Sequence, residues 1–279
     1  MVSAIPALYA QGVIPQHRSM PHNRFAHRYR GINRALIRPL IRQRAKLDAF
    51  FMKRFRTNSL STWFLRALRH QHHQRFGPEG NYYEFGIGKG RSMSRFLRAL
   101  KVFCDAEDLD LYGYSLFLFD SFEGMPSKSS PRDEHPGFSK GVLSFSLEQT
   151  RTRMSKQLDL SRGNVHFIKG FFDESLTPEL ANGLAAHPPS LVTVDVDYYT
   201  STKSVLEWIL PFTPTGCLFY FDDIWLFYGH PEMGQVAAIN EINQSGIGYL
   251  IPYPELGTTV GGRSFVFSRR EFELQKARW

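Results

Sequence analysis

The sequence predicts an α/β fold of the Rossmann-like class, with a mostly parallel sheet, helices on both of its faces and an N-terminal helical extension. After Gly80, short apolar runs of strand length alternate with amphipathic stretches of helix length. Glycine or acidic residues follow several of these runs, as they do at the ligand-binding edge of open α/β sheets. With 279 residues the chain can bury one full core, so we expect a single large domain over residues 79–279.

The first 78 residues differ from the rest of the chain in composition. Residues 1–35 mix Pro, His, Arg and Ser without apolar periodicity, which predicts a flexible basic arm. Residues 36–78 carry apolar side chains at helical spacing, which predicts a helical extension. The apolar positions are Leu36, Leu40, Leu47, Phe51 and Phe55 in a first helix and Leu60, Phe64 and Leu68 in a second.

The charge of the chain is divided unevenly between its two parts. Residues 1–75 contain 15 Lys and Arg and a single acid, Asp48, for a net charge of +14. Because the whole chain carries +8, the remainder carries −6. The basic part could dock on a nucleic acid or anionic surface, act as a transit peptide, or match the acidic body within the chain or across a subunit interface. We favour the last interpretation and do not expect nucleic acid as the partner.

Cysteine usage and hydropathy exclude several classes of protein. Cys104 and Cys217 lie far apart in apolar runs, which is neither a disulfide framework nor a zinc pattern. No run approaches the roughly 20 apolar residues that span a bilayer, and no positive region precedes the short apolar start. We therefore expect a cytoplasmic protein without a membrane span.

Seven segments of the large domain predict strands because they are short, apolar and rich in aromatic and β-branched residues. They cover residues 81–87, 114–120, 164–170, 190–197, 215–223, a stretch around 249–254, and 263–268.

Helices are predicted between these strands. Met93, Phe96, Leu97 and Leu100 form one apolar stripe that packs on the sheet. Two further helices are predicted over residues 201–212, with Ser201 or Thr202 as N-cap, and over residues 232–243. Residues 121–163 are the least regular segment and predict an active-site loop or lid.

A glycine-rich turn follows the first predicted strand. Gly86, Gly88 and Gly90 leave room for a ligand to approach the backbone, although a plain tight turn has the same appearance. Glu84, just before the first glycine, suits the cationic amino group or sulfonium region of S-adenosylmethionine and would repel a pyrophosphate. Asp120 ends the second strand, where a carboxylate can accept hydrogen bonds from both ribose hydroxyls of an adenosine; its alternative role is a turn cap.

Four aspartates follow two later strands. Asp195 and Asp197 end one strand, and Asp222 and Asp223 end the next. Three carboxylates about 4 Å apart at an effective dielectric near 20 repel by roughly 4 kcal/mol per pair, so a cation must compensate unless the last two only cap a helix. Mg²⁺, which prefers carboxylate oxygens, suits this set.

A metal site of this kind indicates a reaction that needs an activated hydroxyl. A metal can lower the pKa of a hydroxyl and fix its position for in-line displacement at a methyl group. Asp197 is the candidate general base, and His230 and Lys169 are the alternatives.

Five segments of the chain resemble the macrolide-sugar O-methyltransferases typified by macrocin O-methyltransferase. They are YEFGIGKGRSM, LFLFDSFEGMP, KGFFDESL, VDVDYYTST and FDDIW, within a similarity that spans about residues 45 to 268. The resemblance implies a class I methyltransferase with a central seven-stranded sheet, often oligomeric. It also implies Mg²⁺ ligands at Asp195, Asp222 and Asp223, a base at Asp197, and a cofactor site around Glu84, Gly86, Ser92, Asp120 and Ser121.

We therefore expect a Mg²⁺-dependent enzyme that transfers a methyl group from S-adenosylmethionine to a hydroxyl of a small substrate, with a sugar or glycoside as the leading candidate. The alternatives are a methyltransferase for a nucleic acid or other macromolecule docked by the basic arm, and a non-catalytic module that binds S-adenosylmethionine.

Overall fold

The computed structural model describes residues 59–74, 80–257, 259 and 261–271. All of them belong to one compact unit, Met52–Trp279. The basic arm predicted over residues 1–35 and the first helix of the predicted extension lie outside the described residues. The second helix of that extension is present as α4, Leu60–His73.

A seven-stranded sheet forms the centre of this unit, in the order β3-β2-β1-β4-β5-β7-β6. The first five of these strands are parallel, whereas β7 runs antiparallel to both β5 and β6. The predicted mostly parallel sheet is confirmed, and each predicted strand segment overlaps one observed strand. The strands are β1 Asn81–Phe85, β2 Ser115–Asp120, β3 Val165–Lys169, β4 Leu191–Val194, β5 Leu218–Phe221, β6 Gly248–Pro252 and β7 Arg263–Arg269.

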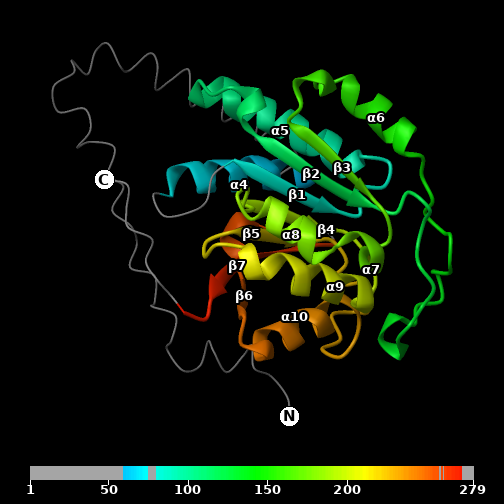
Figure 1. The fold of residues 1–279 in the computed structure, drawn as a ribbon. Coiled ribbons are helices and arrows are strands. Elements are labelled where there is room, and N and C mark those ends of the chain that lie inside the picture. The colour runs from blue at the N-terminus through cyan, green and yellow to red at the C-terminus, as the bar shows by residue number, and fades with distance from the viewer. Residues whose placement is uncertain (1–58, 75–79, 258, 260, 272–279) are drawn as a thin grey trace. The chain divides into compact units, whose positions relative to one another are not determined.

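Helices cover both faces of the sheet (Figure 1). On one face α4 packs against α5, and α6 follows beside α5. On the other face α9 packs against α10 and contacts the shorter α7 and α8. The helices beyond α4 are α5 Arg91–Glu107, α6 Leu147–Ser155, α7 Phe172–Ser175, α8 Pro178–Leu184, α9 Tyr199–Ile209 and α10 Gly234–Ser245.

The central strand β1 shows how the sequence divides between the two faces. Tyr82 stacks on Phe96 of α5, with ring centroids 3.9 Å apart, whereas Tyr83 stacks on Phe117 over the opposite face at 4.7 Å. Because side chains alternate along a strand, Glu84 shares the α4–α5 face with Tyr82. This alternation puts a buried carboxylate directly under the glycine-rich turn.

The start of α9 differs from the prediction. Ser201 and Thr202 lie inside this helix, and the N-cap is Tyr198, whose side chain makes no capping hydrogen bond. Asp133 supplies the cap instead, because its carboxylate accepts hydrogen bonds from the Thr200 amide (3.1 Å) and hydroxyl (2.8 Å). A carboxylate from a distant loop therefore satisfies the amide that a local Ser or Thr usually satisfies.

The segment 121–163 is more ordered than the sequence suggested. It contains the helical turns Pro131–Asp133 and Leu160–Arg162 as well as α6. Asp133 is fully buried within it, and Thr150 of α6 donates a hydrogen bond to the Gly88 carbonyl at 2.7 Å. The segment thus packs on the glycine-rich turn at one end and on α9 at the other.

The sequence predicted neither a membrane span nor a disulfide framework. None of the described helices is both long enough and apolar enough to cross a membrane. Cys104 and Cys217 are buried free thiols, as expected for a chain without a disulfide framework.

Candidate active site

Three of the four aspartates converge at one edge of the sheet. Strands β4 and β5 are parallel neighbours, so the residues that follow them meet at their carboxyl ends. Carboxylate oxygens of Asp195, Asp222 and Asp223 all lie within 4.8 Å of one another. All three residues are half-buried, and the sequence-based expectation that they gather is met by this geometry.

A hydrogen-bond frame holds these acids in place. The Tyr220 hydroxyl donates to Asp222 Oδ1 at 2.9 Å, and Asp223 Oδ2 accepts from the Asp197 amide at 2.9 Å. The Asp223 amide donates to Gln235 Oε1 (2.9 Å), and Gln235 Nε2 donates to the Val194 carbonyl (3.1 Å). Gln235 therefore ties β4 to the residue that follows β5.

Tyr220 and Gln235 were not among the sequence-predicted site residues. Tyr220 could have been found, because it lies two residues before Asp222 and thus on the same face of the strand. Gln235 carried no such signal, because it lies on α10, 12 residues beyond Asp223 in the chain.

The three clustered carboxylates repel one another, and a bound cation would offset this repulsion. Burial and the neighbouring carboxylates of Asp223 and Asp222 raise the pKa of Asp195, and burial together with Asp197 and Asp222 raises the pKa of Asp223. Among the described residues, the three acids accept no hydrogen bond or ion pair from a Lys or Arg side chain. Their convergent oxygens therefore fit a hard divalent cation such as Mg²⁺, which would offset this repulsion.

Asp197 occupies an unusual backbone position beside the cluster. Its φ angle is +59°, and the amide of Tyr198 donates to the Val196 carbonyl at 2.6 Å, so Asp197 is the centre of a tight turn. Left-handed backbone is uncommon outside glycine, and strain of this kind concentrates at functional sites. Burial, with a contribution from the charge of Asp222, raises the pKa of Asp197 to about 6.

The glycine-rich turn contacts the acidic cluster directly. A Cβ atom at Gly86 would lie 1.8 Å from the Asp195 carbonyl oxygen, so the residue at this position cannot carry a side chain. Gly86 and Gly90 have φ angles of +83° and +68°, and Gly90 is the N-cap of α5. The turn that could receive a cofactor and the acids that could bind a cation thus form one continuous edge.

Glu84 and Ser92 lie beneath this turn. The Ser92 hydroxyl donates to Glu84 Oε1, and the Tyr82 hydroxyl donates to Glu84 Oε2 at 3.1 Å. Glu84 is 0% exposed, and its burial raises its pKa to about 7 despite these two hydrogen bonds. In this conformation, Glu84 supports the loop from below and does not present its carboxylate at the surface.

Asp120 closes the other side of the turn. Its Oδ2 accepts from the Gly88 amide at 2.8 Å and its Oδ1 accepts from the Phe122 amide at 2.6 Å. Each carboxylate oxygen can accept a further hydrogen bond, so this capping role leaves capacity for a ribose. Ser121 is used locally, since its hydroxyl donates to the Gly124 carbonyl at 2.9 Å.

The alternative bases lie in different surroundings. Lys169 ends β3, which is separated from β4 by β2 and β1, or about 14 Å at normal strand spacing, and it pairs with Glu123 at 3.2 Å. His230 is exposed, and its Nδ1 accepts from the Glu232 amide at 3.2 Å. Asp197 is the candidate that directly adjoins the acids.

An aromatic group lies next to Asp197. The rings of Phe138 and Tyr198 meet edge-on at 6.2 Å, and His135 contacts both Phe138 (4.7 Å) and Phe227 (5.6 Å). The Tyr198 hydroxyl is buried and has no hydrogen-bond partner among the described residues. The sequence did not predict this aromatic group as part of the site, because residues 135–138 come from the least regular segment of the chain.

Comparison with known proteins agrees with this architecture. The family described as macrocin-O-methyltransferase (TylF) matches residues 71–238, more than half of the chain. The structure of the O-methyltransferase NovP is similar with a TM-score of 0.51 and 20% identity, over 74% of this chain and 78% of that one. The calicheamicin methyltransferase CalS11 is similar with a TM-score of 0.55 and 19% identity, over 72% and 77% of the two chains. These two likenesses show the shared fold, and no curated protein matches the chain in sequence.

Proposed function

The chain belongs to the macrocin O-methyltransferase (TylF) family and is an O-methyltransferase, and on this premise we propose that it methylates a hydroxyl of a small glycoside with S-adenosylmethionine and Mg²⁺. The observation that carries the proposal is the contact between the glycine-rich turn and the acidic cluster at Gly86 and Asp195. A methyl donor on the turn and a cation on the acids would be neighbours, as methyl transfer to a cation-held hydroxyl requires.

Three acids would hold the cation. Asp195, Asp222 and Asp223 supply the oxygens, and Tyr220 and Gln235 fix two of these residues through hydrogen bonds. When bound, a divalent cation lowers the pKa of an acceptor hydroxyl and fixes its position. The outer hydrogen bonds orient the ligands, so they belong to the same functional unit.

Residues of the turn would hold the methyl donor. S-adenosylmethionine supplies a methyl group on a sulfonium centre. Gly86 and Gly88 would let it approach the backbone, Gly90 opens α5 beside it, and Asp120 would accept hydrogen bonds from its ribose. Ser121 borders this position, and Glu84 with Ser92 supports the turn from below.

Asp197 would take the proton of the acceptor hydroxyl. In the overall reaction the acceptor oxygen forms a bond to the methyl carbon, the carbon–sulfur bond breaks, and the proton passes to the Asp197 carboxylate. A carboxylate with a pKa of about 6 is a stronger base than an ordinary aspartate and is still largely ionised at neutral pH.

The test is product formation with purified protein, S-adenosylmethionine and a panel of glycosides, followed by mass spectrometry with Mg²⁺ or with EDTA. We expect methylated product with Mg²⁺ and none with EDTA. Asp195→Asn should abolish turnover and keep S-adenosylhomocysteine binding by calorimetry, while the exposed Asp173→Asn on α7 serves as the matched control.

Three outcomes would contradict the proposal in different ways. Full activity in EDTA removes the cation from the reaction. Cofactor binding without product from any acceptor indicates a binding module. Methylation of RNA or protein, lost when the basic first 35 residues are deleted, indicates a macromolecular substrate.

A further inference from the structure

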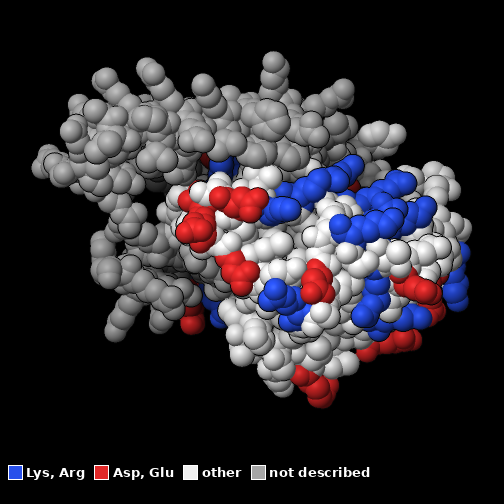
Figure 2. All heavy atoms as spheres, turned by 90° about the horizontal axis from the view of Figure 1, so that it is seen from above, with Lys and Arg blue, Asp and Glu red and all other residues white. Residues whose placement is uncertain are grey.

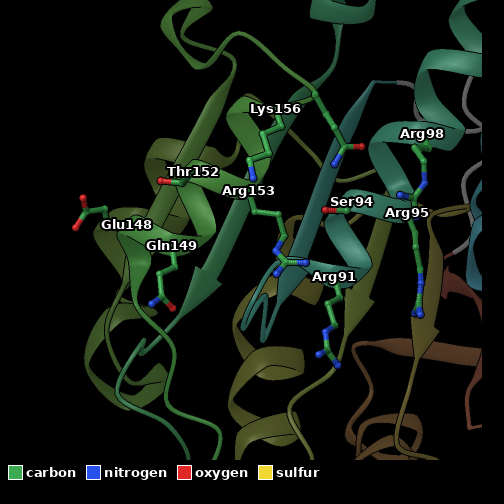
Figure 3. A pocket seen from close by; sticks show the side chains of 10 residues that line it. Arg91, Ser94, Arg95, Arg98, Glu148, Gln149, Thr152, Arg153 and Lys156 are labelled. Atoms are coloured by element: carbon green, nitrogen blue, oxygen red, sulfur yellow. The ribbon is translucent and has the colours of Figure 1, made fainter.

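A basic groove lies between α5 and α6, apart from the three clustered acids. Its volume is about 860 Å³, and five of the ten residues that line it are Lys or Arg, against one acid, Glu148. Figure 3 shows the arginines of α5 on one wall and the basic residues of α6 on the other. The five cations are Arg91, Arg95, Arg98, Arg153 and Lys156.

These five cations form no ion pair in the part of the chain that the structure describes, although Glu148 lines the same groove. No ion pair or cation–π contact involves any of them there. Other described cations do have partners: Lys203 of α9 pairs with Glu241 of α10 at 3.1 Å, and Arg162 lies over the ring of Tyr112 at 4.5 Å. The groove therefore gathers five cations that no ion pair neutralises within the described residues.

The three arginines of α5 repel one another because their like charges lie close together on the helix. Arg91, Arg95 and Arg98 are exposed and lie three and four residues apart, so they form one row on the helix. Like charges at these spacings destabilise a helix. Arg153 closes the row from the other wall, because its Cδ lies 3.8 Å from a Cβ built on Gly90 at the start of α5.

A second feature of the groove points to a bound group. Ser94 lines it between the arginines and is 8% exposed, and its hydroxyl is buried without a hydrogen-bond partner among the described residues. A buried polar atom without a partner costs free energy, and a ligand that accepts its hydrogen bond removes that cost.

We propose that the α5–α6 groove is a second binding site for a ligand with a chain of linked phosphates, such as the polyphosphate of a nucleotide or a free polyphosphate. The row from Arg91 to Arg98 extends for about 10 Å along the helix, which is too long for a single phosphate. Guanidinium groups bind phosphate oxygens in pairs of hydrogen bonds, and the excess of four positive charges matches several ionised phosphates better than one carboxylate.

The lining also argues against single-stranded nucleic acid. Such ligands bind through bases stacked on aromatic side chains, and none of the ten lining residues is aromatic. Figure 2 views the molecule from the side that α5 and α6 occupy in Figure 1 and shows basic side chains grouped there. The groove thus favours binding to phosphates alone.

The experiment is calorimetry of the full chain in EDTA with phosphate, pyrophosphate, tripolyphosphate and ATP as probes. We expect affinity to rise with the number of linked phosphates and to fall with added salt. Arg95→Gln combined with Arg98→Gln should weaken tripolyphosphate binding by about tenfold or more. Ser94→Ala should weaken it by about two- to tenfold.

The matched control is Lys101→Gln combined with Lys140→Gln, which removes two exposed charges outside the groove and should change affinity less than about twofold. Thermal unfolding of each variant checks that it is folded.

Equal affinity for ATP and tripolyphosphate indicates that the site recognises the phosphate chain alone, and tighter binding of ATP indicates that it recognises a nucleotide. Absent binding, binding unchanged by the groove variants, or equally tight binding of an acidic peptide or duplex RNA would each overturn the proposal.

Discussion

The acidic cluster after β4 and β5 and the basic groove between α5 and α6 both gather like charges, but they do so in opposite settings. The acids are half-buried, converge within 4.8 Å and are fixed by hydrogen bonds to Tyr220 and Gln235. The arginines of the groove are exposed on a helix surface. At 4 Å two unit charges repel by about 4 kcal/mol at an effective dielectric of 20 but by only about 1 kcal/mol in water. The carboxylates of the first region therefore repel one another strongly unless a cation binds between them, whereas the charges of the second region repel only weakly in water.

The largest expected effect comes from breaking the acidic cluster. Asp195→Asn should lower methyl transfer by more than about a hundredfold, because even outer partners of metal ligands contribute 10- to 100-fold. The same variant should stabilise the metal-free protein by on the order of 1 kcal/mol, because one repelling charge is gone. Thermal unfolding with and without Mg²⁺ measures this, and equal Mg²⁺ stabilisation of the variant and of wild type would contradict the assignment.

Asp197→Asn separates proton removal from cation binding within that cluster. Asparagine tolerates the φ angle of +59° at this position, so the turn should persist. We expect kcat to fall by about 10²- to 10⁴-fold while Mg²⁺ still raises the unfolding temperature. A variant that loses both effects together would place Asp197 among the ligands.

The stability of the metal-free protein should depend on pH through the buried acids. The raised pKa values of Glu84 (about 7) and Asp197 (about 6) mean that the folded state binds more protons than the unfolded chain between about pH 4 and 7. The free energy of unfolding should therefore fall as pH rises through this window, by up to about 1.4 kcal/mol for each unit by which a pKa is raised. Denaturant titrations in EDTA from pH 5 to 8 measure it, and Mg²⁺ should reduce the slope. A flat or rising profile would show that these carboxylates are solvated.

The smallest effect is expected in the groove without a ligand. Arg95→Gln removes two like-charge pairs on α5 and should stabilise the protein by about 0.4–1 kcal/mol at low salt. This corresponds to an unfolding temperature about 1–4 °C higher, and the gain should vanish at 1 M salt. Lys101→Gln is the control, because Arg98 and Asp105 at helical spacing offset each other there. A lower unfolding temperature for Arg95→Gln would mean that the arginine is stabilised by its surroundings.

Most of the sheet could be predicted because strands are encoded locally. Runs such as residues 115–120 and 218–221 are apolar over the length of a strand, and no helical period fits them as well. The four aspartates could be predicted to meet because parallel strands end at the same edge. The sequence did not show that Glu84 is 0% exposed under the turn, because that depends on which helix covers it.

One error and two omissions share a cause. The N-cap of α9 was placed at Ser201 or Thr202, whereas Asp133, 67 residues before Thr200, provides it. Helix α6 was not predicted: it lies in the segment 121–163, which was predicted to be the least regular and an active-site loop or lid, and which also carries Asp133. Gln235, which joins β4 to Asp223, was not predicted at all. In each case the partner lies far away in the chain, where local spacing carries no information.

The sequence by itself determined the class of fold, the order along the chain of the seven strands and of three helices after Gly80, and the chemical identity of the acids and glycines at the sheet edge. These follow from short-range periodicity and from residue type. The tertiary structure decided which distant groups share a space: Asp133 with α9, Gln235 with Asp223, and α6 with the arginine row of α5. The physical reason is that burial and charge interactions depend on distance in space, which the packing of helices on the sheet sets and the spacing along the chain does not.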